Sequence, residues 1–228
     1  MISTKKAMVI LMKKIYLSPS DQISNTYPNT ALYNGHVTSE AEQMRRVADA
    51  LERALIRNGF TVKNNQISSM ASRVSESNSW KSDMHVCIHS NGCNGVVSGT
   101  RMFSYDTHGE GYKACKKVFD VLAPITPGTS ENIKAYPSLY EIRNSDAICV
   151  YIEVDFHDVP DVAKWIIANV DTIGEAICQG ICDYYGDGYF PPEEEKKEPV
   201  SEWVEVGSYL VKEQDGAIVA KPKGGIYG

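Results

Sequence analysis

The sequence lacks two features that would each define a class of protein. Among its 228 residues, no hydrophobic run approaches the roughly 20 residues that a membrane-spanning helix needs. It also lacks a surplus of basic residues, because its formal net charge is −6 at pH 7. A basic patch is the usual mark of a nucleic-acid-binding surface. We therefore expect neither a membrane span nor a nucleic-acid partner.

The cysteines do not follow a metal-binding or disulfide pattern. Six are present, but their spacing fits neither a zinc knuckle nor a dense disulfide framework. Several lie inside apolar runs, such as Cys87 and Cys149. Cys178 and Cys182 are four residues apart in a predicted helix and could share one face. We expect most of the cysteines to be small buried apolar side chains.

The first residues do not form a recognisable signal peptide. The apolar run 7–12 is shorter than a signal-peptide core, and no small-residue cleavage site follows it. The sequence therefore predicts export by another route, release by lysis of the cell as for a phage protein, or action in the cytoplasm where the protein is made.

Predicted strands and helices alternate along most of the chain, which favours an α/β fold. Apolar residues make up 43% of the sequence, enough for a sizeable core. We predict a mostly parallel twisted sheet flanked by helices. The expected strands are 14–17, 60–62, 84–89, 99–105 and 147–154, and the expected helices are 40–58, 70–80, 111–122, 161–169 and 171–185.

Composition divides the chain into three parts. Residues 13–186 are predicted to form a single catalytic domain, and 187–201 are rich in proline and charge, as a linker is. Residues 202–228 contain β-prone pieces but are too few for a robust core of their own. We predict a small C-terminal extension or a truncated module there.

Two apolar strands end in side chains that can carry chemistry. His89 ends the run 84–89, and Glu153 lies near the end of the run 147–154. Ligands bind beyond the carboxyl ends of parallel strands, so these side chains are expected to share one edge of the sheet. A carboxylate in an apolar strand is costly unless it is paired, protonated or bound to metal. The structural alternatives are a backbone-bonded His89 and an ion pair between Glu153 and Arg143.

Glu40 is a third candidate, at the start of the helix 40–58. Ser39 and Glu42 fit a capping box there, which leaves Glu40 without a capping role. A carboxylate in this first turn could face a metal, or it could simply complement the helix dipole. His85 precedes His89 by four residues, roughly 13 Å along a strand at about 3.3 Å per residue, so the two should not bind one ion.

These pieces together resemble the zinc-dependent N-acetylmuramoyl-L-alanine amidases of bacteria and phages, over roughly residues 14–185. The similarity rests on Glu40 at a helix start, on the strand 83–91 (DMHVCIHSN) and on Glu153 in the segment 153–156 (EVDF). Arg73 and Asn78 also match residues that the family carries before the histidine strand, and 99–103 matches the strand that follows it. The resemblance implies zinc bound by Glu40 and His89.

One family feature is missing. Members usually carry a first zinc histidine just after the first strand, where this chain has the segment 17–22 (LSPSDQ). His36 is our candidate for this ligand, with Asp21 or Gln22 as alternatives. We further predict that Asn91, Arg73 and His157 bind substrate.

The implied activity is hydrolysis of the amide between N-acetylmuramic acid and L-alanine in peptidoglycan. Zinc would keep an open position for water, and Glu153 would take the proton and pass it to the leaving amine. We expect a monomer that acts on the cell wall. Two alternatives stay open: a wall-binding protein with a degraded site, and a zinc carboxypeptidase acting on wall peptides.

Overall fold

The computed structural model describes residues 12–193, 203–214 and 217–223. The chain divides into two units, Met1–Pro191 and Pro192–Gly228, and each is described by itself. The apolar run 7–12 lies outside the described residues except for Met12, and most of the predicted linker also lies outside them. Within the described part, every helix is too short or too polar to cross a membrane.

A six-stranded sheet forms the centre of the first unit, in the order β4-β1-β5-β8-β6-β7. Neighbours pair in parallel except for β6 and β8, which are antiparallel. The prediction of a mostly parallel sheet is confirmed. The strands are β1 (Lys14–Pro19), β4 (Thr61–Asn64), β5 (Met84–Asn91), β6 (Arg101–Ser104), β7 (Asn132–Ala135) and β8 (Ile148–Phe156).

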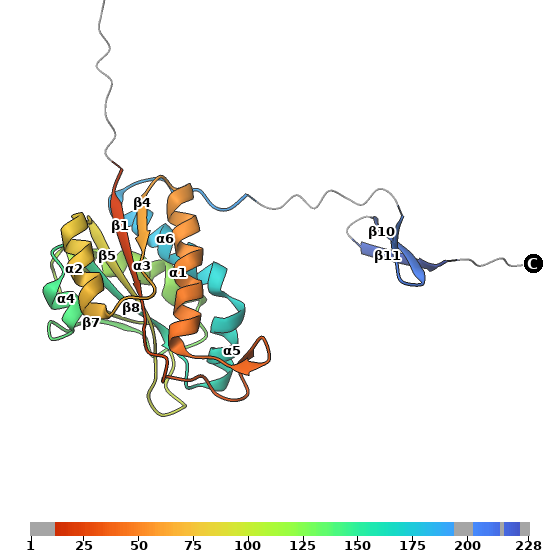
Figure 1. Cartoon of the computed structure of the whole chain (residues 1–228), viewed down its shortest axis with the longest axis horizontal. Helices are drawn as coiled ribbons and strands as arrows, with labels where there is room; N and C mark the ends of the chain where they lie inside the picture. The colour runs from red at the N-terminus through yellow and green to blue at the C-terminus, as the bar shows by residue number, and fades with distance from the viewer. Residues whose placement is uncertain (1–11, 194–202, 215–216, 224–228) are drawn as a thin grey trace, which may run out of the picture. The chain divides into compact units, whose positions relative to one another are not determined.

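Helices flank this sheet, as predicted (Figure 1). Helices α1 and α3 both pack against α6, while α2 packs against α4. The close approach of α3 to α6 depends on Gly180 of α6, because a Cβ at this position would collide with the backbone of Val118 in α3. The helices are α1 (Glu40–Arg57), α2 (Met70–Trp80), α3 (Glu110–Leu122), the 3₁₀ turn η1 (Ala123–Ile125), α4 (Tyr140–Asn144), α5 (Pro160–Ala168) and α6 (Val170–Tyr185).

The segment between β1 and α1 contains a small hairpin, β2 (Leu32–Tyr33) and β3 (His36–Val37). Its turn is Asn34-Gly35, with φ of 49° and 81°. Both residues have the positive φ that a two-residue hairpin turn requires, which Asn-Gly supplies at low cost. Ser39 caps α1 as predicted, because its side chain accepts a hydrogen bond from the Glu42 N–H.

The central strand β5 separates an apolar face from a polar one. Side chains alternate along a strand, so Met84, Val86 and Ile88 point into the main core. His85, Cys87 and His89 point to the other face of the sheet, which α2 and α4 cover. Five of the six cysteines are buried and all are free thiols, in line with their predicted packing role.

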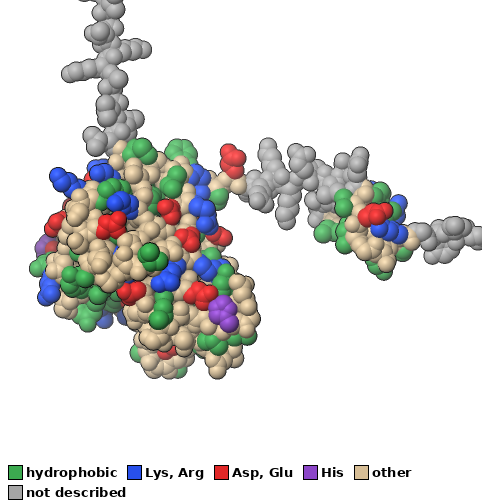
Figure 2. All heavy atoms as spheres, viewed as in Figure 1, with side chains coloured by type: hydrophobic (Ala, Val, Ile, Leu, Met, Phe, Trp, Pro, Cys, Tyr) green, Lys and Arg blue, Asp and Glu red, His purple; other side chains and the backbone are tan. Residues whose placement is uncertain are grey.

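The second unit is an antiparallel sheet in the order β11-β10-β9. Its strands are β9 (Val204–Val206), β10 (Tyr209–Gln214) and β11 (Ala217–Pro222). Lys221 lies over the ring of Trp203, 4.2 Å from its centroid. The strands fall where β-prone pieces were expected, although most described side chains here are exposed. Figure 2 shows acidic and basic side chains interspersed on the face in view.

Contacts beyond α6 predict where the chain can be shortened. Phe190 exchanges two hydrogen bonds with the Asn58 side chain, and the Tyr189 hydroxyl donates to Glu175. A protein ending at Pro191 should therefore melt as the parent does. One ending at Gly186 should melt a few degrees lower, because each lost bond is worth about 1 kcal/mol. Identical melting of both truncated proteins would contradict this.

Candidate active site

The candidate residues meet at the carboxyl ends of the central strands. His89 of β5 and Glu153 of β8 are direct partners in the parallel register. Their side chains therefore leave the sheet on the same side and at the same level. His89 and Glu153 therefore lie next to each other at one edge of the sheet, as predicted.

Glu40 contacts His89 at the carboxyl edge of the sheet. Its Oε1 lies 2.9 Å from His89 Nδ1, and both side chains are buried. The contact forms because Glu40 is the first residue of α1, whose N-terminus faces this edge. The Asn25 side chain donates a 2.8 Å hydrogen bond to the other oxygen of Glu40.

Carboxylates surround the imidazole of His89 and control its charge. Burial lowers the pKa of His89, but the neighbouring carboxylates of Glu141, Glu40 and Glu153 raise it to about 10. Burial likewise raises the pKa of Glu40, but the hydrogen bond and charge of His89 bring it below its ordinary value. A metal-free site therefore holds a proton on His89, and a metal would have to displace it.

Glu153 is half-buried, and its carboxylate forms no ion pair with a described lysine or arginine side chain. Burial raises its pKa to about 7, with the charge of His89 acting in the opposite direction and that of Glu40 in the same direction. Its Oε2 has no hydrogen-bond partner. The alternative ion pair with Arg143 does not form, because Arg143 is exposed and none of the ion pairs among the described residues involves Glu153. A pKa near neutrality suits a group that must both take and give a proton.

A polar pocket of about 490 Å³ opens beside these residues. Glu40, Glu153, Asn91 and His157 line it together with the loop after β1. His157 is held firmly there: its Nδ1 lies 2.8 Å from the Ser90 carbonyl oxygen, and its ring stacks on that of Tyr27. Since Nδ1–H donates to the carbonyl, the lone pair of neutral His157 lies on Nε2. Asn91 and His157 thus both line the pocket, and their role in binding substrate stays a prediction.

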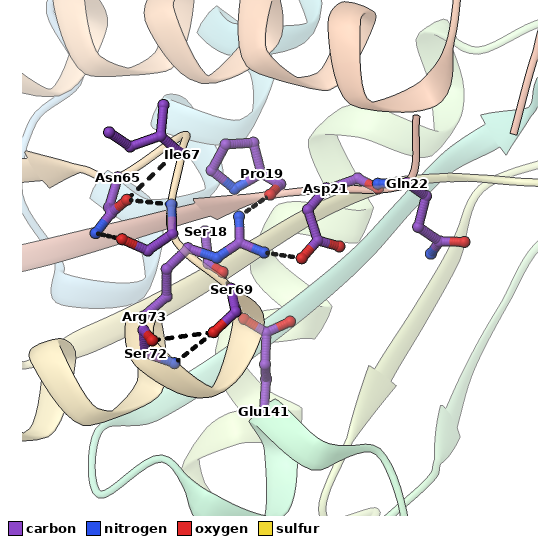
Figure 3. A network of polar contacts seen from close by, with 12 residues as sticks. Ser18, Pro19, Asp21, Gln22, Asn65, Ile67, Ser69, Ser72, Arg73 and Glu141 are labelled. Carbon is purple, nitrogen blue, oxygen red and sulfur yellow. Dashed lines mark hydrogen bonds and ion pairs between the residues drawn. The ribbon is translucent and has the colours of Figure 1, made fainter. Parts of the chain in front are cut away.

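Three predicted residues lie elsewhere. His36 is half exposed in the β2–β3 hairpin, and its Nε2 contacts the Glu42 carboxylate at 3.0 Å. Figure 3 shows the buried Arg73 side chain between the Pro19 carbonyl oxygen and the carboxylate of Asp21. None of the three lines the pocket. Arg73 and Asp21 instead pin the loop after β1 to α2, and the Asn-Gly turn holds His36 away.

Gln22 differs from these residues because it lines the pocket. Its side chain points away from the Arg73–Asp21 pair (Figure 3). The Gln22 Oε1 accepts a 2.6 Å hydrogen bond from Asn25, the residue that also donates to Glu40. Gln22 is therefore connected to the Glu40–His89 pair through one shared amide group.

A second polar cluster lies beside His89, and its central residue, Glu141, was not among the predicted site residues. Glu141 of α4 is buried, and its Oε1 accepts from Ser18 at 2.5 Å and lies 3.1 Å from His85 Nε2. Among the described residues, only His85, Cys87 and Glu141 form a group of three metal-type side chains with ligand atoms within 4.8 Å. Glu40 and His89 do not belong to this group.

These features together define the class of protein. A polar pocket at the carboxyl edge of a parallel sheet, lined by His157, Glu40 and the proton-accepting Glu153, has the groups that a hydrolytic enzyme uses. The N-acetylmuramoyl-L-alanine amidase family model matches residues 26–183, well over half of the chain. The chain belongs to the N-acetylmuramoyl-L-alanine amidase family, which makes it a peptidoglycan amidase.

Solved structures share this fold. Cwp6 from Clostridium difficile is 21% identical with a TM-score of 0.64, and the match covers 76% of this chain but 29% of Cwp6. The catalytic domain of the amidase CwlV from Bacillus (Paenibacillus) polymyxa is 16% identical with a TM-score of 0.65, covering 78% of this chain and 100% of that domain. None of the curated proteins matches the sequence.

The raised pKa of Glu153 predicts a pH-dependent stability of the metal-free protein. Between the ordinary pKa of 4.5 and the folded value of about 7, the folded state binds more protons than the unfolded state. The free energy of unfolding therefore falls as the pH rises through this window. Glu153→Gln removes this loss, so its melting temperature relative to the parent should rise by several degrees between about pH 5 and pH 8.

Thermal melting in the presence of a chelator measures this difference directly. The comparison uses the difference between the two proteins at each pH, which cancels the effects of titrating groups that both share. A difference that stays constant across the window would show that Glu153 ionises normally in the fold.

Proposed function

We propose that this amidase cleaves the bond between N-acetylmuramic acid and L-alanine with a zinc ion held by Glu40 and His89 and with Glu153 as the general base. The observation that carries the proposal is the 2.9 Å contact between Glu40 and His89 beside Glu153, at the edge of the pocket. The protein would act on the cell wall as a monomer.

Glu40 and His89 can fill two of the coordination positions of a zinc ion. Zinc dependence is general in this family. Glu40 Oε1 and His89 Nδ1 offer one oxygen and one nitrogen ligand atom, both of types that zinc binds. They come from different elements and are brought together at the cost of burying charge. Such a buried pair is expensive for a fold that does not use it.

Gln22 is our candidate for the third protein ligand. The family histidine is missing at the end of β1, and Asp21 and His36 are engaged with Arg73 and Glu42. Gln22 lines the pocket and is linked to Glu40 through Asn25. An amide oxygen is a weaker zinc ligand than an imidazole, so the proposal implies weaker zinc binding than three strong ligands would give.

The chain's own residues then divide the work of hydrolysis. Glu153, with a pKa of about 7, can take a proton from water in the pocket and pass it to the leaving amine. The Asn91 side-chain amide can donate a hydrogen bond to a substrate carbonyl, and the Nε2 lone pair of His157 can accept one from a substrate N–H. A bound zinc ion would supply Lewis acidity that polarises the scissile carbonyl.

Zinc content should depend on His89 and not on His36. Elemental analysis of the purified parent should give one zinc per chain, and His89→Ala should lose it because half of the strong ligand pair is gone. His36→Ala is the matched control and should keep parental zinc. Gln22→Ala should bind zinc more weakly than the parent. Equal zinc in the parent and His89→Ala proteins would remove His89 from the ligand set.

Glu153→Gln should abolish hydrolysis while leaving zinc in place. Glutamine keeps the shape of the side chain but cannot accept the proton, and general base catalysis typically contributes about 10²–10⁴-fold. The measurement is the release of L-alanine amino termini from purified sacculi, with melting temperature and bound zinc determined on the same samples. Near-parental release by a stable, zinc-loaded variant would end the catalytic role of Glu153.

A wall-binding protein is the second candidate function, favoured by the missing histidine after β1. The proton-accepting pKa of Glu153 and the open pocket favour the enzyme instead. The two functions separate in the sacculus assay. A parent protein that sediments with sacculi but releases no amino termini, even with added zinc, would support the binding function.

A further inference from the structure

Glu141 is a buried carboxylate that contacts Ser18 and His85 and lies near His89, although no sequence pattern marked it as a site residue. It belongs to the five-residue helix α4 and is 1% exposed. Its Oε1 accepts a hydrogen bond from Ser18 of β1 and contacts His85 of β5. Its other oxygen, Oε2, has no hydrogen-bond partner. A buried carboxylate with one free oxygen calls for an explanation.

The free oxygen faces His89. Glu141 Oε2 lies 3.9 Å from His89 Nε2, and this nitrogen is itself buried without a hydrogen-bond partner. The other nitrogen of the same ring, Nδ1, contacts Glu40. The Nδ1 atom of His89 therefore faces Glu40, which lines the pocket, and its Nε2 atom faces Glu141. Closing the gap between Oε2 and Nε2 by less than one ångström would make a charge-assisted hydrogen bond.

This arrangement has a chemical consequence for a metal ligand. A histidine that binds a metal through Nδ1 carries its proton on Nε2, and that N–H needs an acceptor when it is buried. A carboxylate acceptor fixes the tautomer and the ring orientation, and it makes the ligating nitrogen more basic. Tyr151 adds to this by stacking on the His89 ring, with 4.8 Å between centroids and an interplanar angle of 9°.

We propose that Glu141 is a positioning residue that accepts a hydrogen bond from His89 Nε2–H and so keeps His89 Nδ1 free and aimed at the metal. The inference rests on the proposed function, because it assumes that His89 binds zinc. It goes beyond that function by assigning a role to a residue that contacts neither zinc nor substrate.

The surroundings of Glu141 hold its carboxylate in place. His85, its partner, is stacked on Tyr16 with 5.3 Å between ring centroids. The Asn78 side chain of α2 donates to the Asn144 carbonyl oxygen and accepts from the Asp146 N–H, which fixes the end of α4. Hydrogen bonds on one oxygen and an anchored helix together orient the other oxygen toward His89.

The His85–Cys87–Glu141 cluster could also hold a metal of its own. Glu141 Oε1 is already engaged by Ser18 and His85, so an ion there would have to displace both contacts. Cys87 is fully buried beside Cys149, with 3.8 Å between the sulfur atoms. We favour the role of Glu141 on His89 and make the inner metal site an outcome of the test.

The experiment compares Glu141→Ala, Glu141→Gln and the control Glu76→Gln in the full chain. Glu76 is a carboxylate on the same face of the sheet that bonds Tyr16 and has no contact with His89, so Glu76→Gln should keep parental zinc affinity. Glu141→Ala should weaken zinc binding about 10–100-fold. Glu141→Gln should lie between, because its amide oxygen can still accept a hydrogen bond without the charge.

The ¹⁵N spectrum of the histidine side chains supplies a readout that a purely structural role would not change. The chain has five histidines, so each ring can be assigned by single substitutions. In the zinc-loaded parent, His89 should show a protected Nε2–H proton, and Glu141→Ala should lose that protection. Melting temperatures identify folded samples, and Glu141→Gln carries the comparison if Glu141→Ala does not fold.

Three results would overturn the inference, and they are distinguishable from one another. Parental zinc affinity and a parental His89 signal in both Glu141 variants, with zinc still lost in His89→Ala, would refute the role of Glu141 alone. Zinc lost in Cys87→Ala but kept in His89→Ala would locate the metal in the inner cluster. A parent protein that binds no zinc would refute the proposed function and this inference with it.

Discussion

The parallel pairing of β5 with β8 is the constraint on which the site depends. It sets His89 and Glu153 side by side at the carboxyl edge of the sheet. Because side chains alternate along a strand, a slip of one residue in either strand would turn its functional side chain into the apolar core. The core side chains Val86, Ile88 and Val154 oppose such a slip, since they would have to leave the core at the same time.

Placing several carboxylates around one imidazole lowers the stability of the fold, because the carboxylates repel one another and lose contact with water. Glu40, Glu141 and Glu153 all lie close enough to His89 to influence its pKa. Their mutual repulsion is relieved in two ways: His89 takes a proton, and burial together with Glu40 raises the pKa of Glu153. A cation bound at Glu40 and His89 would relieve the same repulsion. The charge balance of the fold therefore already favours a positive group at this point.

The sequence predicted the parts of the site that lie on regular elements. Helical periodicity and the Ser39 cap placed Glu40 at a helix start, and two apolar runs placed His89 and Glu153 at strand ends. What it missed depended on tertiary contacts. Neither α4 nor β7 was predicted, because each is only four or five residues long and lies in a segment without clear periodicity. The role of Glu141 follows from where α4 packs, which no local pattern contains.

The position of His36 follows from the turn beside it and not from the metal site for which it was a candidate. The Asn34-Gly35 pair is a strong hairpin signal, and it directs His36 onto Glu42 rather than toward the pocket. Arg73 lies outside the pocket, because its buried side chain contacts the loop after β1 through Pro19 and Asp21. That loop is the very segment in which the family histidine is missing. Its anchoring by Arg73 holds the Asp21 carboxylate away from the pocket, while Gln22, the next residue, lines the pocket.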